Sequence, residues 1–123
     1  MKRVLAATVG IGLAVVLLFA VAEATQNRHD TDRHDGTSTV VMHVSTKRGF
    51  AYEAAAHSLW AACQTTVLSN RLASLTALPE PGIVVLTVEP ALGEHAQRRL
   101  VGCLEDATVD LVSAQVHSVV HSD

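Results

Sequence analysis

Apolar positions recur along residues 39–123 with two different periods, one typical of strands and one typical of helices. The alternating stretches 39–45 and 111–120 and the β-branched run 83–89 predict three strands. Spacings of three to four predict helices over 50–66 and from Glu94 to about Thr108. Residues 68–78 fit both periods. We assign a strand there because a turn-forming sequence, Pro79-Glu80-Pro81-Gly82, follows it.

The predicted order is strand, helix, strand, strand, helix, strand. This order indicates an α+β domain of the ferredoxin-like βαββαβ type, in which two helices cover one face of a four-stranded antiparallel sheet. In the alternative, the first helix extends through Leu75 and leaves a three-stranded sheet. Topology of this kind predicts a fold and carries no information about function.

The first 24 residues combine a basic start with a long apolar run. Lys2 and Arg3 precede the apolar residues 4–22. At about 1.5 Å per residue this run would reach ~28 Å, close to the hydrocarbon thickness of a bilayer, which favours an uncleaved membrane anchor. The small residues Ala20, Ala22 and Ala24 have the spacing of a signal-peptidase site and favour cleavage near Ala22 or Ala24.

Both alternatives give the same orientation. The positive-inside rule keeps Lys2 and Arg3 in the cytoplasm and places the rest of the chain outside. We therefore expect an extracytoplasmic protein, anchored in the membrane through residues 4–22 or secreted after cleavage. Residues 25–38 contain no apolar side chain and predict a polar linker, so the folded domain is expected to span 39–123.

Composition excludes some partners. Aromatic residues make up only 3% of the chain, too few for a surface on which bases or sugars stack. The net charge is −3 and the nine basic side chains are scattered, so no nucleic-acid partner is expected. Glu53 and His57 are four residues apart on a predicted helix, but no nucleophile motif accompanies them. We therefore expect neither an enzyme nor a cofactor.

Cys63 and Cys103 are the only cysteines, and two arguments about them disagree. An extracytoplasmic compartment permits disulfides and a small domain profits from one. In two antiparallel helices, however, the two positions should be offset by ~10–15 Å, whereas a disulfide needs Cα atoms within about 7 Å. We give the compartment more weight and expect the pair to be bonded.

Three histidines fall on strands that the predicted order makes neighbours. His43 alternates with Val40, Met42 and Val44, while His117 and His121 lie on the last strand. Three imidazoles on the sheet face away from the helices could bind Zn or Cu. The simpler interpretation is three solvent-exposed histidines on an open sheet.

The same uncovered face predicts a contact surface. Alternation places the following residues on it: Val41, His43, Val85, His117 and Val119. An apolar strip of this kind marks a contact site more often than idle surface. We expect a small binding module that contacts a protein partner or a second copy through this face. The alternatives are a metal-binding cell-surface or periplasmic protein and, less favoured, a small enzyme.

Overall fold

The computed structural model describes residues 11–21, 35–47 and 49–123. Residues 11–21 are helical. The other described elements follow in this order: β1 (Thr37–Thr46), α2 (Tyr52–Cys63), the 3-10 helix η1 (Gln64–Val67), β2 (Arg71–Ala77), β3 (Ile83–Glu89), α3 (Glu94–Asp106) and β4 (Val112–Ser122). The domain is therefore α+β, and the alternative with a three-stranded sheet is wrong.

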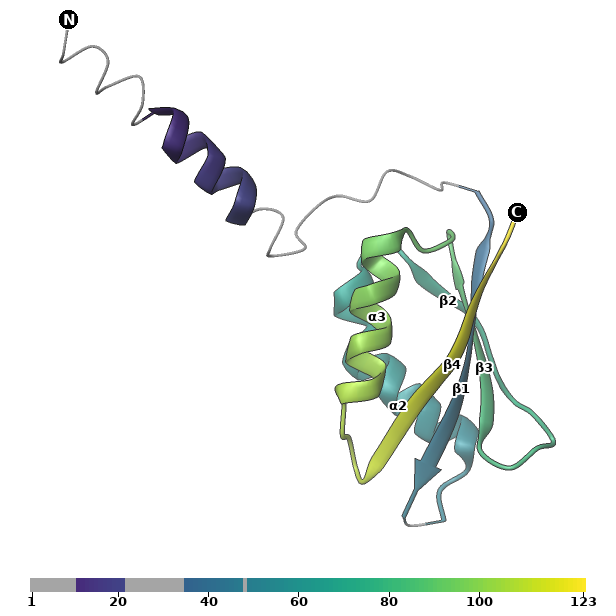
Figure 1. Ribbon diagram of the computed structural model, residues 1–123. Coiled ribbons are helices and arrows are strands. Elements are labelled where there is room, and N and C mark those ends of the chain that lie inside the picture. Colours follow the sequence, from purple (N-terminus) through teal and green to yellow (C-terminus); the bar gives the residue numbers. More distant parts are fainter. Residues whose placement is uncertain (1–10, 22–34, 48) are drawn as a thin grey trace, which may run out of the picture.

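The four strands form one antiparallel sheet in the order β2-β3-β1-β4. The two long helices, α2 and α3, lie on the same side of this sheet (Figure 1). The other face carries no helix among the residues that the structure describes. The sheet therefore has one face in the core and one open face.

Alternation along the strands selects the buried face. Val40, Met42 and Val44 of β1 are fully buried, while their neighbours in the sequence are half-buried or exposed. In β3 the buried positions are Val84, Leu86 and Val88. These side chains meet Leu59 of α2 and Leu100 and Leu104 of α3 in one hydrophobic core. In both strands the buried positions alternate with half-buried or exposed ones, as the period of a strand predicts.

Tight turns define the ends of the elements. Gly82 has φ +82°, a conformation that glycine adopts without steric cost, and its carbonyl accepts the Val44 N–H at 2.7 Å. α2 ends at Cys63, earlier than the predicted residue 66, because the chain tightens there into η1. β1 starts at Thr37, two residues inside the stretch that composition assigned to the linker.

Cys63 and Cys103 form a disulfide, with their Cα atoms 5.7 Å apart. The offset of ~10–15 Å expected between antiparallel helices is wrong. Cys63 is the last residue of α2, and η1 continues the chain beside α3, where Arg99 Nε donates to the Thr66 carbonyl at 3.1 Å. Thr66 lies three residues after Cys63, and Arg99 lies four residues before Cys103. This contact therefore places the two cysteines side by side along the axis of α3.

The expected membrane-targeting segment lies largely outside the described residues, which include only 11–21 of the first 24. Within the described part of the chain, no helix has the length and apolar character needed to cross a membrane. Most of the predicted linker also lies outside the described residues.

Candidate functional site

The open face of the sheet is the largest surface that the sequence predicted as functional. We define its centre by the outward residues in the middle of the four strands, which are Ser74 and Thr76 of β2, Ile83, Val85 and Thr87 of β3, Thr39, Val41 and His43 of β1, and Gln115, His117, Ser118 and Val120 of β4. None of them is an acid, a lysine or an arginine. Val41 and Val85 are cross-strand partners within it.

Polar contacts on the open face link neighbouring strands. The hydroxyls of Thr39 and Thr87 lie 3.5 Å apart. Arg71 and Glu89 form an ion pair of 2.8 Å across β2 and β3. This pair lies at one end of β2 and β3, beside the uncharged centre, so it does not interrupt the apolar strip.

A β-bulge in β4 decides which histidines share the open face. Val41 pairs with Ser118 while Met42 pairs with Val116, so His117 is the extra residue on β4. Both residues of the bulge, His117 and Ser118, are exposed. The bulge brings the His117 ring to the His43 ring, with centroids 6.5 Å apart and planes at 89°.

Beyond the bulge, every side chain of β4 changes face. Val119 pairs with the buried Val40 and packs against the core, so its predicted place on the open face is wrong. His121 likewise lies on the helix side, since it pairs with the buried Ser38. The physical reason is that one additional residue reverses the alternation of a strand. In the sequence, apolar residues stand at 112, 114 and 116 and then at 119 and 120, a pattern that is compatible with a bulge but does not locate it.

The expected metal site is therefore not assembled as a group of three histidines. The structure brings His43 and His117 together and places His121 on the opposite face. No group of three or more His, Cys, Asp or Glu side chains suited to a metal ion occurs within the described residues.

His121 instead belongs to a hydrogen-bond network under the helices. The hydroxyl of the fully buried Ser38 accepts the Leu92 N–H at 2.8 Å and lies 2.7 Å from His121 Nδ1. His121 Nε2 lies 2.9 Å from Gln97 Oε1, which can only accept. Nε2 therefore donates to Gln97 Oε1, and a second hydrogen bond joins Nδ1 to the Ser38 hydroxyl.

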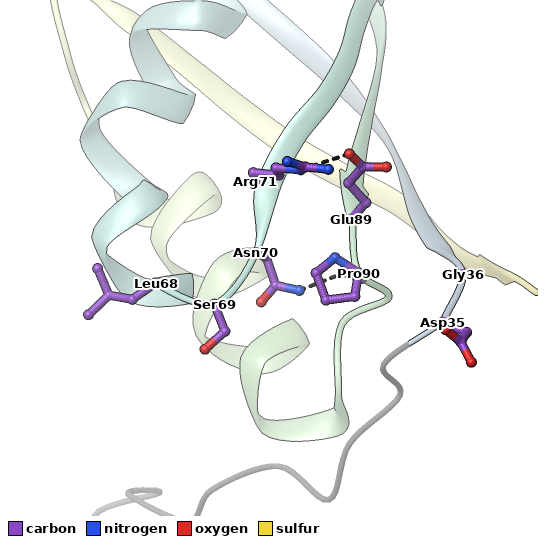
Figure 2. A pocket seen from close by; sticks show the side chains of 8 residues that line it. All are labelled: Asp35, Gly36, Leu68, Ser69, Asn70, Arg71, Glu89 and Pro90. Atoms are coloured by element: carbon purple, nitrogen blue, oxygen red, sulfur yellow. Dashed lines mark hydrogen bonds and ion pairs between the residues drawn. The ribbon is translucent and has the colours of Figure 1, made fainter.

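A polar pocket of about 600 Å³ lies where β2 and β3 meet the start of β1 (Figure 2). Asn70 Nδ2 donates to the Pro90 carbonyl at 2.7 Å across it. Arg71 and Glu89 point toward one another, so the guanidinium charge is already paired (Figure 2). This pairing leaves the pocket without a feature that specifies a ligand.

A second pocket, of about 590 Å³, lies at the other end of the domain between the segments that hold Phe50 and Leu111. Asp110 and Leu111 have φ of 51° and 65°, an uncommon left-handed conformation for such residues. Glu53 and His57, the pair considered for acid–base chemistry, are exposed on α2 and line neither pocket.

Comparisons of the chain with protein-family models, with curated proteins and with solved structures gave no match.

Proposed function

We propose that this protein is a small extracytoplasmic binding module, tethered to the membrane or secreted, that works without catalysis and contacts a protein partner or a second copy through the open face. The observation that carries the proposal is the uncharged centre of that face around Val41 and Val85. The centres of protein interfaces are depleted in charged residues, whereas a sheet face that only meets water carries more of them.

The ferredoxin-like fold belongs to the same proposal. Its support is the strand order β2-β3-β1-β4 with antiparallel neighbours and both long helices on one face. The extracytoplasmic location is supported by the basic start before residues 4–22 and is compatible with the Cys63–Cys103 disulfide.

Sedimentation of the protein at pH 7.5 tests the open face. Val41→Asp is expected to weaken self-association at least about tenfold, because it buries a carboxylate at the contact. The control is Ser45→Asp, which adds the same charge at an exposed position near the end of the same strand. Two results together would contradict the proposal. The protein would have to be monomeric at high concentration, and every partner that it captures would have to bind Val41→Asp equally well.

Metal binding is the second candidate function, and the paired rings of His43 and His117 favour it. Two imidazoles supply part of a Zn or Cu coordination sphere, and a second copy could supply the rest. The test is stoichiometric Zn or Cu in the untagged protein, lost in His117→Ala. Metal content equal in both proteins would exclude this pair as the ligands.

A further inference from the structure

The outer edge of β4 carries backbone groups that face away from the sheet. The Val116 N–H points outward, where it donates to Glu105 Oε1 at 3.1 Å. In β1 the Val44 N–H points toward β3, where it bonds Gly82. Because the backbone groups of successive residues point to opposite sides of a strand, the N–H and C=O groups of the odd-numbered residues of β1 point toward β4. Their partners Val120 and Ser118 consequently bond β1. Val119 and His121 are left with N–H and C=O groups directed outward.

Glu105 meets this edge at Val116. Its carboxylate reaches Val116 from the last turn of α3, before the bulge at His117. Beyond the bulge, no described residue bonds the outward backbone groups of Val119 or His121. Among the described residues, the stretch Ser118–Ser122 is therefore an edge with unbonded outward backbone groups.

Ser118–Ser122 also lacks the usual protection of an edge strand. Such edges are normally blunted by charged side chains, proline or a short length. β4 has eleven residues and contains no acid, lysine, arginine or proline. The opposite edge, β2, has seven residues, begins with Arg71 and has its own bulge. The β2 edge is thus protected by its short length, a charged residue and a bulge, whereas β4 beyond its own bulge has no such protection against the addition of another strand.

We propose that a second copy of this chain pairs with Ser118–Ser122, antiparallel, about a twofold axis at Val120. Val119 of each copy then lies opposite His121 of the other, and each such pair exchanges both backbone hydrogen bonds. Val120, which is 54% exposed on the open face, meets its own copy on the axis. The two four-stranded sheets become one continuous sheet.

The chemistry of β4 favours a second copy as the occupant. A twofold pairing of a strand with itself sets like residues near one another, so charged residues would repel, and this strand has none. The edge is also held in place, since His121 is hydrogen-bonded to Ser38 of β1 and Gln97 of α3. Ordering the strand therefore costs little on association. The inference stands apart from binding through the open face.

Disulfide trapping in the full chain tests the axis. In Val120→Cys the two introduced thiols would face one another, within the separation that a disulfide needs. A mild thiol oxidant should convert this variant to a covalent dimer at least about tenfold faster than the matched Ser113→Cys, which is exposed on the same strand but far from the axis. Equal rates, or no dimer from Val120→Cys, would overturn the proposal.

A charge exchange gives a second, independent readout. Val120→Lys and Val120→Glu should each be monomeric, and their mixture should restore the dimer, because only a contact of residue 120 with its own copy is repaired in this way. A dimer in either variant alone, or no dimer in the mixture when the unsubstituted chain is dimeric, contradicts the axis. Loss of dimer in Val41→Asp but not in Val120→Lys would assign self-association to the open face instead.

Discussion

At the scale of single residues, Ser38 is the most constrained polar side chain in the core. It is fully buried, accepts the Leu92 N–H and contacts His121. One hydroxyl thus joins the start of β1, the segment before α3 and the end of β4. Buried polar groups stabilise a fold when every member is bonded and cost free energy when one partner is lost.

Ser38→Ala should lower the free energy of unfolding by about 1–3 kcal/mol, because it leaves the Leu92 N–H without its acceptor in a buried site. The measurement is denaturant unfolding beside Ser45→Ala, an exposed serine on the same strand that should change stability by less than about 0.5 kcal/mol. Equal stabilities of the two variants would show that the network contributes nothing.

At the scale of elements, the short length of α2 matters most. Because α2 ends at Cys63 and η1 follows, the C-terminal end of the helix meets the later part of α3 instead of running alongside it. Cys63 and Cys103 are thereby brought to bonding distance. The disulfide closes a 40-residue loop that contains β2, β3 and most of α3.

Replacing both cysteines by alanine should lower the free energy of unfolding by about 4 kcal/mol, the entropy released to the unfolded chain by opening a loop of this length. Urea unfolding of Cys63→Ala/Cys103→Ala against the unsubstituted protein gives the value. Thiol labelling of the denatured, unreduced protein is the control. Two labelled thiols per chain would contradict the bond itself.

At the scale of the whole molecule, both ends of the folded domain lie together. Thr37 pairs with Ser122, so the segment that enters β1 and the C-terminus share one end of the sheet (Figure 1). The segments around Phe50 and Leu111 lie at the opposite end. The open face and the β4 edge run between these ends.

A reporter enzyme fused after Asp123 should be active only as an exported type, because the positive-inside rule predicts that a chain with Lys2 and Arg3 before an apolar run keeps this basic start in the cytoplasm. Changing both to Glu is the matched variant and should reduce export. The mass of the mature chain distinguishes an anchor from a cleaved peptide. Activity of a cytoplasmic reporter alone would refute the orientation.

The sequence by itself determined the order of the elements, the α+β class and the buried faces of β1 and β3, because these follow from periods within one segment. Only the tertiary structure decided where His121 and Val119 lie and that the cysteines meet. Contacts between distant segments set the bulge at His117 and the position along α3 at which the end of α2 packs. A shift of one residue there exchanges the faces of a strand, and no local pattern determines the register between two strands.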